Sequence, residues 1–339
     1  MSLEIIQPKG PVQSQGPTHS SYAPVNVGVD VSKASLDVDM VPTPAPLQVS
    51  NDQAGFARLL AHLSGRQVQR VVIEGTGGYE RPVVRALREA GYVVCLINPR
   101  RARDFAKSIG ALAKTDRIDA AVLARFGADV RPEPTAAPKL GQEHQAALVI
   151  RRRQLVGMRA AELNRLQQQQ DVSALASVQT VIDFLSEQVA DLDRQIEESI
   201  EADPQSAARD KALRQVPGVG AVVSRTLLAE LPELGSVSRG RIAALAGLAP
   251  FADDSGTIKG KRSIQGGRFA VRRVLYMAAL TACRVNPVIR SFHQRLRKAG
   301  KSFKQAIVAC MRKLLIHLNE LARKAVAVAP AASQTPAPT

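Results

Sequence analysis

The chain has 339 residues, enough for two or three domains, and 45% of them are hydrophobic, as in globular proteins that bury a core. Lysine and arginine number 46 against 30 acidic residues, which gives a formal net charge of +16. The segment from Gly256 to Thr339 holds 17 lysines and arginines and a single acid, Glu320, so its excess equals that of the whole chain. Such a segment favours a polyanionic partner, most commonly nucleic acid. The absence of an apolar run of about 18 residues and of a signal-peptide core argues against a membrane.

The first domain is predicted to be α/β. Residues 1–24 are rich in Pro, Gly, Ser and Gln, which predicts a disordered leader. In chain order, apolar patterns and capping residues then predict strands at 25–31, 35–40 and 46–50, a helix at 52–65, a strand at 69–74, a helix from about 80, a strand at 92–98, and helices from 99 and about 115. Meandering strands followed by alternating helices and strands predict a mixed five-stranded sheet covered by helices over residues 25–130.

A proline-punctuated stretch, RPEPTAAP at 131–138, predicts a domain boundary. Beyond it we expect only helices, beginning with two long polar ones at 141–170 and about 173–201 in a coiled-coil region spanning 139–204. Apolar residues of the second helix recur at spacings of three and four: Val178, Ile182, Leu185, Val189, Leu192 and Ile196. This seam packs either against the neighbouring helix of the same chain or against another chain.

A mainly helical C-terminal domain is predicted over 207–324, followed by a disordered tail at 325–339. Its segment LRQVPGVGAVVSRTLLAEL (213–231) has a Pro-Gly-Val-Gly turn before a helix start. In a helix–hairpin–helix motif, the backbone around Gly218 and Gly220 would bind a phosphate. A plain turn between two helices accounts for the same pattern.

Cysteine and histidine show no metal-binding pattern. Cys95, Cys283 and Cys310 lie far apart in apolar stretches and are interpreted as buried side chains in a reducing compartment. The five histidines lack ligand spacing, which argues against zinc.

Four carboxylates of the first domain are candidates for one site. Asp30 lies inside an apolar strand, where an isolated charge is costly unless it faces a site. Glu74 ends an apolar strand and precedes the glycine-rich GTGG, and sites lie at the carboxyl ends of parallel strands. Asp116 and Asp119, in KTDRIDA, share one face of a helix and repel each other. First strand, fourth strand and last helix are where the ribonuclease-H-like fold gathers its acids.

Four carboxylates stay ionised together only if a cation compensates them, and Mg²⁺, which prefers oxygen ligands, suits such a cluster. Two such ions activate a nucleophile and stabilise a leaving oxygen on a phosphodiester. The structural alternative is that these residues cap a turn and a helix and form a surface edge. Lys114, just before the aspartate pair, would either steady the carboxylates or touch a phosphate.

Ser255 lies in the glycine-flanked stretch DDSGTIKGKR, and many basic residues follow it. An activated serine is a nucleophile, and dense cations would hold the phosphate it attacks. These candidate phosphate ligands are Lys259, Lys261, Arg262, Arg268, Arg272 and Arg273. From the residues alone, an ordinary serine of a glycine-rich loop is the simpler interpretation.

The motifs together resemble the DEDD transposases of the insertion-sequence one-ten/eleven-eleven family, which are bridge-RNA-guided DNA recombinases. The resemblance runs from about 25 to 315 through VGVDVSKASLDV, IEGTGGYERPV, GYVVCLINPRRARDFAKSIG, AKTDRIDAAVLARF, PGVG, LAALAGLAPFADDSGTIKGKRSIQGG and VRRVLYMAALTA. The KTD-x-x-DA block and the SG…GKR…I-x-GG block are specific in combination.

The resemblance implies a RuvC-like catalytic domain whose acidic tetrad is Asp30, Glu74, Asp116 and Asp119. It also implies that Ser255, in a C-terminal transposase domain, forms a 5′-phosphoserine intermediate. The implied cofactor is Mg²⁺, as two ions, with Mn²⁺ as an alternative. The implied partners are donor and target DNA and a structured bridge RNA, which selects both DNA sites by base pairing. The resemblance also implies a homodimer that assembles into a tetramer. The implied location is cytoplasmic and associated with the nucleoid.

Two other classes of function remain open at this point. A RuvC-type junction nuclease would use the same acids with water as nucleophile and would not need Ser255. A non-catalytic nucleic-acid-binding protein would keep the basic segment with a decayed site, although the intact tetrad argues against it.

Overall fold

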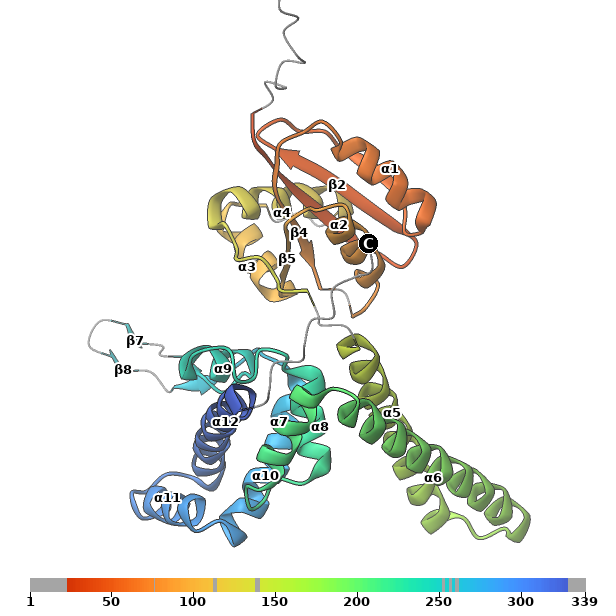
Figure 1. Cartoon of the computed structure of the whole chain (residues 1–339), viewed down its shortest axis with the longest axis vertical. Helices are drawn as coiled ribbons and strands as arrows, with labels where there is room; N and C mark the ends of the chain where they lie inside the picture. Colours follow the sequence, from red (N-terminus) through yellow and green to blue (C-terminus); the bar gives the residue numbers. More distant parts are fainter. Residues whose placement is uncertain are drawn as a thin grey trace, which may run out of the picture. The chain divides into compact units, whose positions relative to one another are not determined.

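The computed structural model of the chain describes residues 23–75, 77–111, 115–137, 141–251, 254–255, 258–259 and 262–328. These residues belong to two compact units, residues 1–137 and 138–339 (Figure 1). Apart from 23–24 and 325–328, the predicted leader and tail lie outside the described residues. Residues 325–328 are the end of a helix, so ordered chain continues past the predicted start of the tail.

The first unit contains a five-stranded sheet, as predicted. Its strand order is β3-β2-β1-β4-β5, in which β2 is antiparallel to β1 and β3, and β1, β4 and β5 are parallel. The sheet is therefore mixed, and the order of elements along the chain is the predicted one. The strands are β1 (Val25–Val31), β2 (Ser35–Val41), β3 (Leu47–Ser50), β4 (Val68–Glu74) and β5 (Val94–Ile97). The helices are α1 (Gln53–Leu63), α2 (Arg81–Glu89), α3 (Pro99–Ser108) and α4 (Asp116–Val130).

Alternate residues of a strand point to opposite sides of the sheet. Helices cover both sides, and each side has its own apolar cluster. Val27 and Val29 of β1 belong to the apolar cluster that includes α1 and α2. Val72 of β4 belongs to the opposite cluster, which is built with α3 and α4 and includes Leu123 and Phe126 of α4. Side chains that follow the alternation of Val72 therefore face α4.

The second unit is mostly helical. The prediction that the chain beyond residue 138 is entirely helical is wrong for a short stretch around 250–264, where two small strand pairs occur. Glycines interrupt that stretch every few residues, and glycine disfavours helix propagation. The helices are α5 (Gln142–Gln168), α6 (Val172–Glu201), α7 (Pro204–Arg214), α8 (Ala221–Glu230), α9 (Arg239–Leu245), α10 (Phe269–Val285), α11 (Pro287–Lys298) and α12 (Phe303–Val328). The strands are β6 (Pro250–Phe251), β7 (Asp254–Ser255), β8 (Ile258–Lys259) and β9 (Ser263–Ile264).

The apolar seam of α6 packs within the chain. α5 and α6 lie side by side as a helical hairpin (Figure 1), in which Leu185 and Val189 of α6 bury against Leu155 of α5. Ile196 belongs instead to the main core of the second unit. The intramolecular interpretation of this seam is therefore correct for these positions.

Two of the cysteines, distant in the sequence, meet in the core between α10 and α12. Cys310 is buried and hydrogen-bonds with the half-buried Cys283. Burial, with the neighbouring thiol, raises the pKa of Cys310 to about 12. Cys95 is buried in the first unit, and all three cysteines are free thiols. None of the described helices is both long and apolar enough to cross a membrane.

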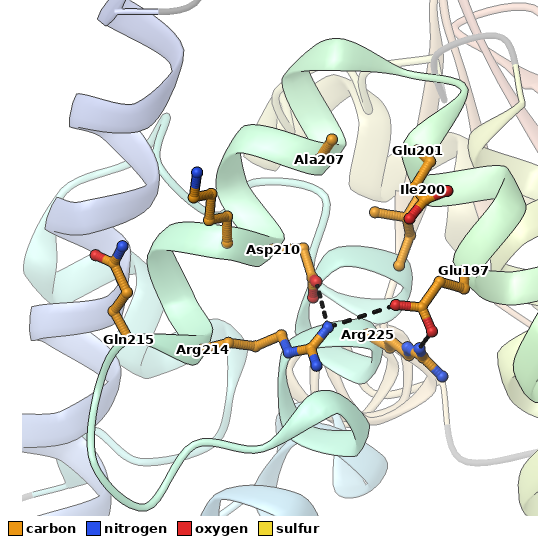
Figure 2. A pocket seen from close by; sticks show the side chains of 9 residues that line it. Glu197, Ile200, Glu201, Ala207, Asp210, Arg214, Gln215 and Arg225 are labelled. Atoms are coloured by element: carbon orange, nitrogen blue, oxygen red, sulfur yellow. Dashed lines mark hydrogen bonds and ion pairs between the residues drawn. The ribbon is translucent and has the colours of Figure 1, made fainter.

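A network of arginines and carboxylates joins α5, α6, α7 and α8 beside an open cavity of about 450 Å³. The buried Arg225 of α8 donates to Asp193 Oδ1 at 2.9 Å and to Glu197 Oε2 at 2.5 Å, both on α6. Arg152 of α5 binds the same aspartate through two nitrogens, at 2.7 and 2.8 Å. Figure 2 shows Arg214 of α7 between Asp210 and Glu197, at 3.2 and 3.6 Å. The network fixes the helical hairpin to the rest of the unit.

Arg225→Gln is expected to lower the free energy of unfolding by about 1–3 kcal/mol, because a buried cation and its two charged hydrogen bonds are lost. Denaturant unfolding of the full chain measures this change. The control is Arg194→Gln, an exposed α6 cation that pairs with Asp191 and Glu198, for which a change below about 1 kcal/mol is expected. Equal effects of the two substitutions would mean that the buried network does not hold the hairpin.

Candidate active site

A row of polar side chains crosses four strands of the sheet. The register that pairs Val29 of β1 with Ile73 of β4 brings the next residues, Asp30 and Glu74, side by side. Across the other edge of β1, Asp30 is paired directly with Asp37 of β2. Asp30 and Glu74 follow the alternation of Gly28 and Val72, so both lie on the face that α4 covers. Two of the four predicted acids are thus neighbours at the carboxyl ends of parallel strands.

Helix α4 brings its first turn to the same place. A Cβ atom at Gly28 would lie 2.1 Å from the carbonyl oxygen of Ala120 and 2.3 Å from the nitrogen of Ala124. At the other end of the strand, a Cβ atom at Gly127 would contact Asn26. The helix therefore runs opposite to β1, and its N-terminus lies toward Asp30. Only a residue without a side chain at position 28 allows this close approach.

The local sequence explains why α4 begins where it does. Thr115 is the N-cap, and its Oγ1 accepts a hydrogen bond from the backbone nitrogen of Ile118 at 3.3 Å. Asp116 and Asp119 consequently fall in the first turn, where the helix dipole favours negative charge.

The donor chemistry of this edge suits a hard divalent cation. Asp30, Glu74 and Asp119 are half-buried and offer carboxylate oxygens, the ligands that Mg²⁺ prefers. Within the described part of the chain, no three His, Cys, Asp or Glu side chains are close enough to hold a metal together. Asp116 is described as a helix position only, and Lys114 lies outside the described residues. The edge thus brings Asp30 and Glu74 together, and the backbone of α4 near its first turn packs against the same strand.

Asp37, which is not among the predicted site residues, extends the acidic row. Its carboxylate accepts hydrogen bonds from Gln48 Nε2 of β3, at 3.0 Å to Oδ1 and 3.3 Å to Oδ2. The alternation in SLDVDM already placed Asp37 opposite the apolar face, but only the register of β1 and β2 brings it next to Asp30.

Ser255 lies in a small hairpin of the second unit, where β7 and β8 pair Ser255 with Ile258. Outside this pair, β6 pairs with β9. A tight backbone contact anchors the end of the hairpin. A Cβ atom at Gly267, whose φ is +71°, would lie 2.1 Å from the nitrogen of Gly247. The double glycine of the SIQGG motif therefore allows the hairpin to dock against the end of α9.

Two of the predicted phosphate ligands have partners within the protein. Arg268 binds both carboxylate oxygens of Glu233. Burial by itself would raise the pKa of Glu233, but the hydrogen bonds and charge of Arg268 lower it below its ordinary value. Arg272 donates to the carbonyl oxygen of Gly266 and lies over the Phe269 ring. Both arginines therefore brace the hairpin.

The structure describes the side-chain exposure of two of the four remaining predicted phosphate ligands. Arg262 and Arg273 are exposed, as a phosphate ligand requires. Lys259 is described as a strand position only, and Lys261 lies outside the described residues.

The Pro-Gly-Val-Gly turn connects α7 and α8 as predicted. Gly218 has a φ of +99°, and a Cβ atom there would lie 2.8 Å from Ala282 of α10, so packing alone accounts for this glycine. Gly220 is the N-cap residue of α8, where no side chain accepts a hydrogen bond from the first turn. An added Cβ atom at Gly220 would meet nothing within 4 Å. Of the two glycines, Gly220 is the better placed for a ligand.

Comparisons with known proteins agree with these motifs. The family models for DEDD transposases of IS110 and for the transposase IS116/IS110/IS902 family match residues 27–173 and 210–294. The chain belongs to the IS110 family of DEDD transposases. The first match spans all four predicted acids of the transposase, and the second spans Ser255.

Relatives of the transposase include two types of protein. A pilin gene-inverting protein of Moraxella lacunata is 29% identical over 299 residues, which cover 85% of this chain and 92% of that protein. An uncharacterized 42 kDa protein of insertion element IS900 from Mycobacterium paratuberculosis is 25% identical over 377 residues, 86% of this chain and 94% of that protein. An uncharacterized 43.6 kDa protein of insertion element IS110 from Streptomyces coelicolor is 31% identical over 154 residues, 45% of this chain and 36% of that protein.

The contact at Gly28 is directly testable. Gly28→Ala is expected to lower the free energy of unfolding by about 2–4 kcal/mol and to reduce DNA cleavage, because the new methyl group overlaps the α4 backbone and displaces its first turn. Denaturant unfolding and a cleavage assay measure the two effects.

The matched control is Gly157→Ala, on the exposed side of α5, where an added Cβ meets nothing within 4 Å. It is expected to raise stability by up to about 1 kcal/mol, because alanine is the better helix former. A Gly28→Ala protein as stable as the wild type would contradict the close approach of α4 and β1.

Proposed function

We propose that the transposase cuts and rejoins DNA with a metal-dependent acidic site, formed by Asp30, Glu74, Asp116 and Asp119, and with Ser255 as nucleophile. The observation that carries the proposal is the convergence of Asp30, Glu74 and the first turn of α4 at one edge of the sheet, in a chain of the IS110 family. The sheet order and the placement of the acids support a RuvC-like assignment for this domain.

The acids would hold two Mg²⁺ ions, or Mn²⁺, which supply charge stabilisation for the attacking and leaving oxygens of a phosphodiester. Asp30 and Glu74 are fixed by their strands, and Asp116 and Asp119 by the capped first turn of α4. Because β1, β4 and α4 pack against one another, the backbone positions that carry the acids would be fixed before any ion binds. Such preorganisation lowers the cost of assembling the site.

Ser255 would act on the DNA backbone in two transesterification steps. In the first, the bond from Ser255 Oγ to phosphorus forms and the bond from phosphorus to the 3′ oxygen breaks. The serine proton is lost and the 3′ oxygen takes up a proton, leaving DNA attached through a 5′-phosphoserine. In the second, the 3′ hydroxyl of another strand loses its proton and bonds to this phosphorus, the bond from phosphorus to Ser255 Oγ breaks, and the serine oxygen takes up a proton, so the strands are exchanged without hydrolysis.

A structured bridge RNA would select the donor and target sites by base pairing, while the protein reads the backbone. The Gly218–Gly220 turn, as a helix–hairpin–helix element, and the cations Lys114, Lys259, Lys261, Arg262 and Arg273 are the proposed phosphate contacts. A dimer that pairs into a tetramer in the cytoplasm, on the nucleoid, would let the acids of one copy complete the serine site of another. The inversion named for the Moraxella relative is a rearrangement that such strand exchange would produce.

Ser255→Ala is expected to abolish covalent attachment of DNA to the protein in the presence of Mg²⁺, because the alanine has no oxygen to bond to phosphorus. End-labelled DNA on a denaturing gel measures the adduct. Cleavage with free 5′-phosphate and no protein-linked DNA in the wild type would contradict the serine step and favour water as nucleophile.

Asp119→Asn and Asp116→Asn are each expected to reduce strand exchange by at least about 100-fold, because each removes a charged metal ligand. They are also expected to reduce the shift in melting temperature that Mn²⁺ produces. The control is Asp129→Asn on the same helix, whose exposed carboxylate pairs with Arg125. Normal strand exchange and a normal Mn²⁺ shift in the Asp119 variant would contradict the metal site.

A further inference from the structure

Uncompensated positive charge concentrates on one part of the second unit. No acidic residue occurs between Gly256 and Glu320. Within this span, α11, the following turn and the first half of α12 expose seven cations, which we call the α11–α12 cation surface: Arg290, Arg295, Arg297, Lys298, Lys301, Lys304 and Lys313. None of the seven forms an ion pair with a described carboxylate, although cations outside this surface do.

The contrast with neighbouring cations shows that pairing is available elsewhere in the unit. Arg323 and Lys324, near the end of α12, pair with Glu320. Arg268, before α10, pairs with Glu233. Carboxylate partners are therefore present elsewhere in the unit, but no described carboxylate pairs with the seven cations of the α11–α12 surface.

Two of the seven cations converge on one aromatic ring. Arg295 Cζ of α11 lies 5.3 Å from the centroid of the Phe292 ring, and Lys313 Nζ of α12 lies 4.6 Å from it. The ring attracts each cation, but the cations repel each other. An anion that bridges them would remove this repulsion and form charge-assisted hydrogen bonds to both.

Two further arginines are oriented without being neutralised. Arg297 donates to the carbonyl oxygen of Lys301 at 2.5 Å, and Arg290 donates to the carbonyl oxygen of Arg284. A neutral acceptor fixes the side chain and leaves its charge in place. The surface is thus partly preorganised for several anionic groups spaced along two helices.

We propose that the α11–α12 cation surface binds the phosphate backbone of duplex DNA, with Arg295 and Lys313 sharing one phosphate region beside Phe292. A group of cations without described acidic partners fits a regular polyanion, whereas a second copy of this chain would oppose like charges across the same surface. The transposase acts on DNA, so the surface gives the proposed strand exchange a place to hold its substrate. The inference rests on that proposed function for the identity of the polyanion.

The test is the salt dependence of DNA binding by the full-length protein. The double variant Arg295→Gln/Lys313→Gln is compared with the wild type on a random-sequence duplex of about 30 base pairs, and fluorescence anisotropy gives the affinity at several salt concentrations. The slope of log affinity against log salt concentration is expected to become shallower by about 1–2, because one or two phosphate contacts are lost.

Two controls separate charge at this surface from charge and stability in general. Arg165→Gln/Arg194→Gln removes two exposed cations that already pair with carboxylates on α5 and α6, and should leave the slope unchanged. Arg295→Lys/Lys313→Arg keeps both charges and should retain most of the wild-type slope.

An unchanged slope in the Gln double variant overturns the inference. A loss confined to single-stranded or structured RNA of the same length overturns the assignment to DNA. The serine adduct assay makes the two hypotheses separable. Wild-type protein that forms the adduct while the Gln double variant keeps its slope contradicts only this inference. A shallower slope in a protein that forms no adduct contradicts only the proposed chemistry.

Discussion

The contact between the backbone of α4 and the strand β1 at Gly28 is the constraint on which the first unit depends. Because position 28 has no side chain, the helix can lie directly on the strand, with Ala120 and Ala124 against it. The capping of α4 by Thr115 then decides which residues occupy its first turn. The close contact with β1 and the capped start of α4 together place Asp119 toward the end of β1 that holds Asp30. A bulkier residue at position 28 would separate the acids without changing any of them.

The acidic row and the basic second unit pose opposite electrostatic problems. In the sheet, Asp30 lies between Asp37 and Glu74, and like charges on neighbouring strands destabilise a sheet unless a cation compensates them. In the helices beyond α9, the charge on the α11–α12 cation surface lacks described acidic partners. The α11–α12 cation surface would gain from a polyphosphate ligand.

Much of the fold followed from local patterns. The apolar run of residues 25–31 and the alternation of residues 35–40 predicted β1 and β2, because burial on one or both faces leaves a period that the sequence records. The prediction of a wholly helical second unit was wrong around residues 250–264, where the paired strands are only two residues long and leave no periodic pattern. The α6 seam was visible as a heptad-like spacing, but its partner was not, since Leu155 and a residue of another chain would produce the same spacing.

The sequence by itself determined the types of residue available: four acids in strand and helix contexts, a serine in a glycine-rich loop, and an excess of cations toward the C-terminus. It also determined where helix α4 starts, because capping is a local interaction. Only the tertiary structure decided which of these groups are neighbours, since strand register and helix packing depend on contacts between distant segments. Asp37 became a neighbour of Asp30 through the pairing of β1 and β2, and Arg268 became a brace through Glu233. Arg295 and Lys313 came to share one ring because two helices pack together, which no spacing along the chain could indicate.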